Sequence, residues 1–333
     1  MSIYKNKIPQ IRIVVTDYCD KKCFYCRPSG EAIRKSNKHE ILSTNEILTI
    51  VESLSLSGVS VVRITGGEPL LHPNIFEIIR KIKRIKGIKE ISLVTRSKNL
   101  KNEAIYLKNA GLDSITISID SLNKVKSKDI LGVDILDDLI EGVKACYELK
   151  IPIKINTVIM KGINDSPDDL LPFIEFAGKY GPADWKLLDF MVLPNQYSKI
   201  DKTFFVNLNE IKKSLKKIGV SNKDEFSVQA GGLGSPMLKI KMKNGVNVFI
   251  KDSTVGSHYA TFCRTCKHFP CQDAIMALRL TSNGNLQKCL YREDNMVPLK
   301  PLLKDSILLN KVIKDVIEEY KTSTFIQNAW KIK

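Results

Sequence analysis

The sequence predicts an α/β protein built on a partial, open (β/α)6 TIM-like barrel with a C-terminal extension. Short β-branched runs alternate with helical patterns over residues 9–195, and this alternation stops after about Asn195. Strands that alternate with helices of about 10–15 residues form βαβ units around a parallel sheet. About six units fit here, against about eight in a complete barrel. The predicted domains are therefore 1–195, the barrel, and 196–333, the extension.

The barrel strands are expected where β-branched residues form short runs bounded by turn residues. They are Ile11–Thr16, Val59–Thr65, Glu90–Val94, Ser114–Ser118, Ile151–Val158 and Trp185–Phe190. The helices between them carry apolar residues at helical spacing. They are Ser43–Leu56, Asn74–Lys86, a helix through Ile105–Ala110, Leu136–Leu149 and one near Pro167–Tyr180. The first begins with Ser-Thr-Asn-Glu, a capping-box pattern that favours a helix start.

The extension has a different pattern. Lys239–Val248 and the Val-Phe-Ile that overlaps its end predict a hairpin that turns at Asn244-Gly245. Gln229–Gly234 is rich in glycine, and cysteines gather between residues 263 and 289. The last ~30 residues predict a basic helix followed by a tail.

Composition and hydropathy point to a soluble globular protein. The 333 residues are 43% hydrophobic and 26% charged, which excludes a disordered or fibrous chain. No apolar run approaches the ~18–20 residues of a membrane-spanning helix, and the N-terminus lacks the apolar core of a secretory signal. We therefore expect a cytoplasmic protein without a membrane partner. In that setting the eight cysteines are better interpreted as metal ligands or redox groups than as disulfides.

The charge is strongly basic, with 52 Lys and Arg against 36 Asp and Glu, a net +16. An excess of lysine is typical of nucleic-acid binding, of anionic ligands or of a solvated surface. The lysines are spread along the chain, and the aromatic residues, 7% of the total, do not alternate with them as base stacking would require. We therefore expect no nucleic-acid partner.

Three cysteines follow the first predicted strand as a CxxxCxxC motif, at Cys19, Cys23 and Cys26. Chemistry in α/β barrels lies in loops at this end of the strands. Three soft thiolates suit a [4Fe–4S] cluster, of which they leave one iron open. Zinc would need a fourth ligand, and the nearest histidine is His39. Three unrelated buried cysteines are the remaining interpretation.

The motif, with aromatic Tyr25 before its last cysteine, resembles the radical SAM superfamily. Gly66-Gly67-Glu68-Pro69 follows the next strand and is similar to the GGEP motif of that superfamily. The resemblance implies that the open iron binds S-adenosylmethionine (SAM). It also implies that an electron donor such as flavodoxin or ferredoxin reduces the cluster, and that SAM cleavage yields a 5′-deoxyadenosyl radical that abstracts hydrogen from a substrate.

Across most of the chain the sequence resembles the GTP 3′,8-cyclases of molybdenum-cofactor biosynthesis. The matching stretches include VRITGGEPLL, AGLDSITISIDSL, KINTVIMKGIND and LRLTSNGNLQKCL. The resemblance implies that SAM is bound by Tyr25, Gly66, Gly67, Glu68, Ser118, Asn156 and Met191. It implies that an anionic substrate is bound by Arg12, Arg63, Lys154 and Arg279. Each of these four cations could instead be a structural or surface charge.

The resemblance also implies a second [4Fe–4S] cluster in the extension, held by Cys263, Cys266 and Cys289. An insertion, KHFPCQDAIMA, adds a fourth cysteine, Cys271. Four thiolates would close the cluster, as in the related twitch and SPASM enzymes, and a closed cluster cannot ligate substrate. Cys271 could instead be free, either inert or a hydrogen donor. A structural zinc site is the alternative for the whole segment.

Other positions depart from the cyclase pattern. Val61 and Ala277 replace basic residues, Val94-Thr95-Arg96-Ser97 replaces Thr-Thr-Asn-Gly, and the paired glycines of the family's C-terminus are absent. These departures favour a paralogue that acts on another small natural-product precursor, such as a nucleotide, a sugar or a modified peptide. GTP 3′,8-cyclase activity itself is the alternative. A cluster- or zinc-stabilised nucleic-acid-binding protein is the alternative from another class.

Overall fold

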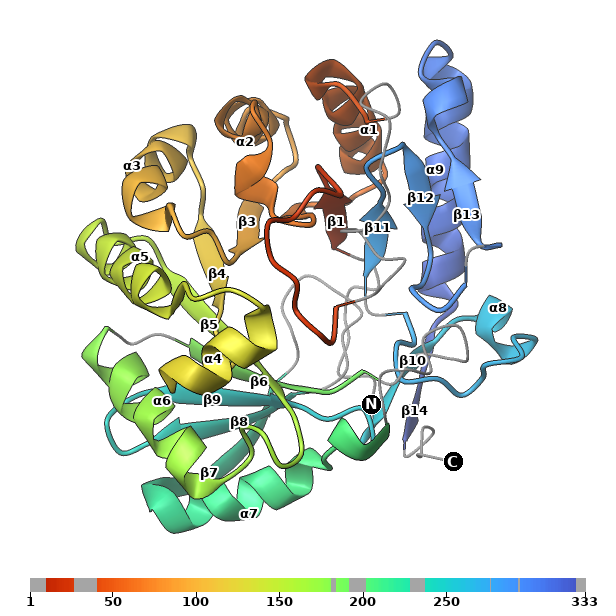
Figure 1. Cartoon of the computed structure of the whole chain (residues 1–333). Coiled ribbons are helices and arrows are strands. Elements are labelled where there is room, and N and C mark those ends of the chain that lie inside the picture. Colours follow the sequence, from red (N-terminus) through yellow and green to blue (C-terminus); the bar gives the residue numbers. More distant parts are fainter. Residues whose placement is uncertain are drawn as a thin grey trace.

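The computed structural model describes residues 10–26, 41–180, 184–191, 202–227, 237–275, 277–292 and 294–327. Its parallel strands are β1 Ile11–Val14, β2 Val61–Thr65, β3 Glu90–Thr95, β4 Ser114–Ser118, β5 Ile153–Ile159 and β6 Asp184–Asp189. Its helices are α1 Thr44–Leu56, α2 Ile75–Lys83, α3 Leu100–Ala110, α4 Lys124–Leu131, α5 Leu136–Glu148, α6 Pro167–Lys179, α7 Leu208–Gly219, α8 Thr261–Arg264 and α9 Ser306–Lys321. Figure 1 shows β1–β6 as a curved sheet with α1, α2, α3, α5 and α6 outside it.

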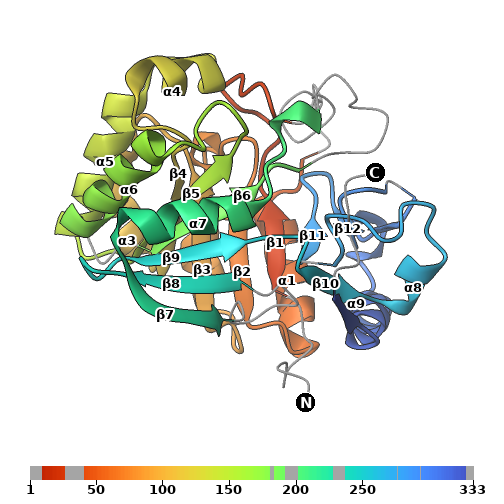
Figure 2. The same cartoon turned by 90° about the horizontal axis from the view of Figure 1, so that it is seen from below.

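The later strands extend this sheet at both edges. They are β7 Val220–Ser227, β8 Met237–Met242, β9 Asn247–Lys251, β11 Leu278–Leu280, β12 Asn285–Gln287 and β13 Met296–Pro298. The order is β13-β12-β11-β1-β2-β3-β4-β5-β6-β9-β8-β7, so that β13 and β7 are its edges and the barrel is not closed. A separate antiparallel pair joins β10 Gly256–Tyr259 to β14 Thr324–Gln327. In Figure 2, β7–β9 continue the sheet beyond β6.

The structure confirms the predicted alternation of strands and helices. The Ser43 hydroxyl accepts from Glu46 N at 3.3 Å, and the Glu46 carboxylate accepts from Ser43 N at 2.7 Å. This capping box starts α1 as the sequence indicates. The predicted hairpin is also present, because β8 and β9 pair antiparallel across Asn244-Gly245. The sequence analysis did not predict α4, α7 or β7. The glycine-rich stretch Gln229–Gly234, between β7 and β8, lies outside the described residues.

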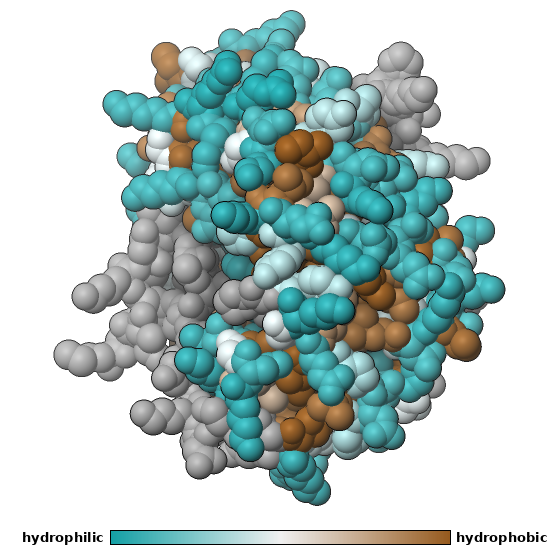
Figure 3. Space-filling model, turned by 90° about the vertical axis from the view of Figure 1, so that its left-hand side faces the viewer, coloured by the Kyte–Doolittle hydropathy of each residue, from teal (hydrophilic) through white to brown (hydrophobic). Residues whose placement is uncertain are grey.

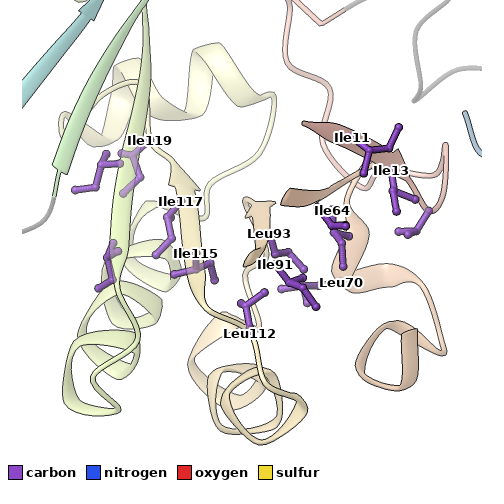
Figure 4. Packing of buried hydrophobic residues seen from close by; sticks show 14 of the residues in the cluster. Ile11, Ile13, Ile64, Leu70, Ile91, Leu93, Leu112, Ile115, Ile117 and Ile119 are labelled. Atoms are coloured by element: carbon purple, nitrogen blue, oxygen red, sulfur yellow. The ribbon is translucent and has the colours of Figure 1, made fainter. Parts of the chain in front are cut away.

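A core of Ile, Leu and Val fills the space between the sheet and its helices. Figure 4 shows residues from neighbouring strands, among them Ile64, Leu93 and Ile117, packed in one layer. Trp185 is fully buried, stacks on Phe173 with ring centroids 5.0 Å apart and donates to the Thr157 hydroxyl at 2.9 Å. The packing fixes the strands in register, so side chains at their carboxyl ends have defined neighbours.

The outer helical face is mainly hydrophilic, with hydrophobic side chains in small groups (Figure 3). Within the described ranges, we find no helix long and apolar enough to cross a membrane.

The extension contacts the barrel beside the first cysteine motif. β11 pairs parallel with β1, and after β11 the Ser282 hydroxyl donates to Asp17 at 2.7 Å. At the other edge, β9 pairs parallel with β6. The barrel and the extension therefore share one sheet, while the domain boundary at residue 195 stays a prediction.

Candidate active site

The first three cysteines lie in the loop that follows β1, at the carboxyl end of the strand. Lys22 N donates to Leu131 O at 3.0 Å, and Phe24 N donates to Ile130 O at 3.2 Å. These bonds fasten the loop to the end of α4. Figure 1 shows the loop crossing the middle of the open barrel. Cys19 and Cys23 are half-buried and Cys26 is exposed.

The thiols of this loop need deprotonation before they can bind iron. Burial raises the pKa of Cys19 to about 11, and it also raises the pKa of Cys23. Within the described residues no three Cys, His, Asp or Glu side chains converge on one metal ion. Each thiolate of a [4Fe–4S] cluster binds a different iron, so the sulfurs need not surround one metal position. Whether a cluster fits is therefore judged by the number and type of the ligands. Three thiols on one loop of eight residues fit such a cluster.

The GGEP loop packs directly against the cysteine loop. Gly67 N donates to Thr16 O and Glu68 N donates to Tyr18 O, both at 2.8 Å. A Cβ at Gly67 would lie 2.3 Å from Tyr18 O, so the close approach requires glycine. The buried Glu68 carboxylate accepts from Thr95 Oγ1 at 2.5 Å and from Arg96 N at 2.8 Å. Glu68 thus joins the loops that follow β2 and β3, while its contact with SAM stays a prediction.

Arg96 enters the same site from the end of β3, and sequence analysis recorded it only as a departure from the cyclase pattern. Its guanidinium donates to Cys23 Sγ at 3.3 Å, to Asp120 at 2.7 Å and to the Tyr25 hydroxyl. Tyr25 also donates to Asp120 at 2.6 Å. Burial acts to lower the pKa of Arg96, but Asp120 and the two other neighbours raise it well above its usual value. Arg96 is therefore a permanent cation beside a candidate ligand.

The other predicted SAM residues lie at strand ends around these loops. Ser118 ends β4 and pairs in register with Asn156 on β5. Met191 follows β6, two residues after Asp189. All three side chains are half-buried. Their contact with SAM stays a prediction.

Sheet register brings the predicted substrate cations to one face. In parallel strands, register partners point to the same side of the sheet. Arg12 is the partner of both Arg279 on β11 and Arg63 on β2. Farther along the sheet and on the same face, Lys154 on β5 lies two residues before Asn156, which is the partner of Lys186 on β6.

Lys186 was missed by sequence analysis, although its place between apolar Trp185 and Leu187 in a predicted strand could have indicated it. Burial lowers the pKa of Lys186 far below its usual value, and the charges of Arg63, Arg12, Lys251 and Lys154 lower it further.

Lys251 was missed as well. It ends β9, where it pairs with Leu188 of β6, and its Nζ lies 4.0 Å from Asp189 Oδ1. The face therefore holds six cations: Arg12, Arg63, Lys154, Lys186, Lys251 and Arg279. Arg63 and Lys251 are buried and the other four are half-buried, so the face is a concentration of positive charge that suits an anion.

The four cysteines of the extension line one cavity, together with Tyr259, Phe269 and Arg292. The space is about 310 Å³, part of it open to solvent. Backbone N–H groups donate to two of the sulfurs, from His268 to Cys266 at 3.4 Å and from Ala274 to Cys271 at 3.3 Å. Burial raises the pKa of Cys263 to about 11 and that of Cys289 to about 12, and it raises that of Cys271 as well. Soft donors gathered around one cavity fit an iron–sulfur cluster.

The cysteine cavity adjoins the cation face. A second cavity, about 230 Å³ including open space, is lined by Cys289, Asp273, Arg12 and Arg279 among others. The insertion that carries Cys271 is fixed here, because Gln272 Nε2 donates to Phe190 O at 2.7 Å and to Asp189 at 3.1 Å. The structure therefore brings the cations and the second cysteine group together, and it places the first cysteine loop after the carboxyl end of β1.

Comparison with known proteins identifies relatives of this chain. Residues 13–176 match the radical SAM superfamily. The chain is 31% identical to a GTP 3′,8-cyclase of Thermodesulfovibrio yellowstonii over 95% of this chain and 91% of the relative. It is 33% identical to a probable GTP 3′,8-cyclase of Pyrococcus abyssi over 89% of each chain.

Solved structures resemble the chain in fold. Native anSMEcpe with bound AdoMet superposes with a TM-score of 0.61 at 15% identity, over 94% of this chain and 82% of that one. Streptococcus suis SuiB bound to S-adenosylmethionine gives a TM-score of 0.53 at 21% identity, over 64% of this chain and 47% of that one.

Proposed function

This chain belongs to the GTP 3′,8-cyclase family of radical SAM enzymes, and we propose that its substrate is a phosphorylated nucleoside or a similarly polyanionic small molecule. The observation that carries the proposal is the cation face, where Lys186 lies among Arg12, Arg63, Lys154 and Lys251. A phosphate chain would replace the mutual repulsion of these groups by charge-assisted hydrogen bonds. An uncharged sugar or an ordinary peptide would leave that repulsion unrelieved.

We assign the catalytic cluster to Cys19, Cys23 and Cys26, and SAM to the loops around Gly67, Ser118 and Asn156. Bound there, the cluster and SAM would supply the radical chemistry that removes a hydrogen atom from the substrate. The role of the protein is to bind and orient that substrate. The six cations bind the phosphates, and Asp189, beside Lys251, keeps the local charge from rising further.

The second cysteine group belongs to the proposal as a closed [4Fe–4S] cluster with Cys263, Cys266, Cys271 and Cys289 as ligands. Its support is that all four side chains line one cavity. With no open iron, this cluster cannot bind the substrate, so recognition falls to the cations and to Asp273 and Gln287 in the adjoining cavity. That difference favours a paralogue with its own substrate. A flavodoxin or ferredoxin in the cytoplasm completes the proposal as electron donor.

The test is SAM cleavage in the presence of candidate substrates. The anaerobically reconstituted enzyme, with dithionite and SAM, is incubated with GTP, the other nucleoside triphosphates, nucleotide sugars and the matching unphosphorylated nucleosides. Chromatography and mass spectrometry measure 5′-deoxyadenosine and new products. We expect phosphorylated compounds alone to stimulate 5′-deoxyadenosine formation. Equal stimulation by the unphosphorylated nucleosides would refute the assignment of the cation face to phosphate.

GTP 3′,8-cyclase activity is the second candidate. It is favoured by 31% identity over 91% of a relative with that name. Formation of cyclised GTP, with the other triphosphates inactive, would establish it and would remove the need for a different substrate.

A further inference from the structure

Arg96 is held in place by three neighbouring residues, unlike an arginine on a surface. Its backbone N–H donates to Glu68 at 2.8 Å, which ties it to the GGEP loop. Its side chain, 14% exposed, pairs with Asp120 at 2.7 Å. The other oxygen of Asp120 accepts from Val158 N on β5 at 2.9 Å, so the anchor is itself fixed. The guanidinium carbon also lies 5.6 Å from the Tyr25 ring centroid.

This fixed guanidinium reaches one of the cysteine sulfurs directly. The Nη1 atom of Arg96 lies 3.3 Å from Cys23 Sγ, within hydrogen-bonding range for sulfur. Other bonds already hold this donor in place. Little further conformational entropy is therefore lost when the thiol becomes a thiolate and accepts its hydrogen bond. Arg96 therefore stabilises negative charge on this sulfur.

The same interaction has a consequence for electron transfer. Reduction adds one electron to a [4Fe–4S] cluster and makes the cluster and its thiolates more negative. Hydrogen bonds to the sulfurs, net charge and burial set the reduction potential of such clusters. A buried cation is screened less than one in water, so its effect on an adjacent charge is large.

We propose that Arg96 is a positioning residue that fixes Cys23 and raises the reduction potential of the cluster bound by Cys19, Cys23 and Cys26. The inference rests on the proposed ligand role of these cysteines. It gives a physical role to a position where the chain departs from the Thr-Thr-Asn-Gly pattern. With the potential raised, a donor such as flavodoxin, ferredoxin or dithionite reduces a larger fraction of the cluster by one electron.

The test is a redox titration of the reconstituted full chain, followed by electron paramagnetic resonance. The signal of the first cluster is identified by its change when SAM is added. Arg96→Gln removes the charge, Arg96→Lys keeps the charge but not the planar fork, and Arg80→Gln changes an exposed arginine of α2 as control. Asp120→Asn releases the guanidinium without removing it.

In Arg96→Gln we expect the reduction equilibrium to become at least tenfold less favourable, a fall of 59 mV for one electron. We expect a smaller fall in Arg96→Lys and no change in Arg80→Gln. We expect no fall in Asp120→Asn, because this variant keeps Arg96 and removes a negative charge near the cluster. A wild-type potential in Arg96→Gln with full iron content would overturn the proposal. If Arg96→Gln loses the cluster, a wild-type potential in Arg96→Lys would overturn it instead. A wild-type chain with no SAM-responsive signal would refute the proposed cluster rather than the role of Arg96.

Discussion

Replacing Lys186 by methionine should weaken phosphate binding and stabilise the ligand-free protein at the same time. The substitution keeps the length and most of the apolar contact of the side chain but removes its charge. A hydrogen bond to a charged group contributes about 1.5–3 kcal/mol. At about 1.4 kcal/mol for each factor of ten, the dissociation constant for a triphosphate should rise about 10- to 150-fold.

The stabilising effect follows from the lowered pKa of Lys186. Burial and four neighbouring cations hold this pKa well below that of an unfolded chain, about 10.4. Below the folded-state pKa, folding must keep an unfavourable charge buried, and this cost disappears as pH rises toward the unfolded value. Removing the charge should therefore stabilise the apoprotein by on the order of 1 kcal/mol near neutral pH. The melting temperature should rise by on the order of 2 °C, and less at alkaline pH.

Isothermal titration with GTP and with tripolyphosphate measures the first effect, and calorimetric melting measures the second. Lys311→Met, on the exposed face of α9, is the matched control and should change neither quantity. Unchanged affinity for both ligands together with a lower melting temperature would show that Lys186 has a structural role and would refute the cation site.

Two further substitutions and one labelling experiment test other parts of the site. In Cys271→Ala, the second cluster should stay bound but acquire an open iron. Added imidazole should bind this iron and change the electron paramagnetic resonance spectrum of the cluster. A spectrum that is the same in the wild type and in Cys271→Ala would show that this thiol is free. Gly67→Ala should lose the first cluster and about 2–4 kcal/mol of stability, because the added Cβ would lie 2.3 Å from Tyr18 O; full iron content in this variant would contradict the packing. In the apoprotein at pH 8, iodoacetamide should label exposed Cys26 faster than Cys19, whose pKa of about 11 leaves little thiolate. The labelling rate of Cys19 should rise as the pH approaches 11.

Local pattern was sufficient to predict the barrel elements and the first site motifs. The capping box at Ser43 and the cysteine loop after β1 depend on residues close together in sequence. The substrate role of Arg12, Arg63 and Lys154 came from the family resemblance alone and stays a prediction.

Long-range pairing limited what the sequence could show. Arg96 meets Cys23, 73 positions away, only because β3 neighbours β2 and β2 neighbours β1. Lys251 joins the cation face only because β9 pairs with β6. No periodicity within a single segment carries this information, since it depends on which strands become neighbours.

The sheet order gives the extension a direct part in the proposed substrate site. Arg279 on β11 reaches the cation face beside β1, and Lys251 on β9 reaches it from the opposite edge beside β6. Buried like charges destabilise a fold unless a ligand compensates them. The extension therefore adds two cations to this face, of which Lys251 lies 4.0 Å from Asp189 Oδ1. The binding of a polyanion should accordingly stabilise the barrel and the extension together, because both contribute to the same charge cluster.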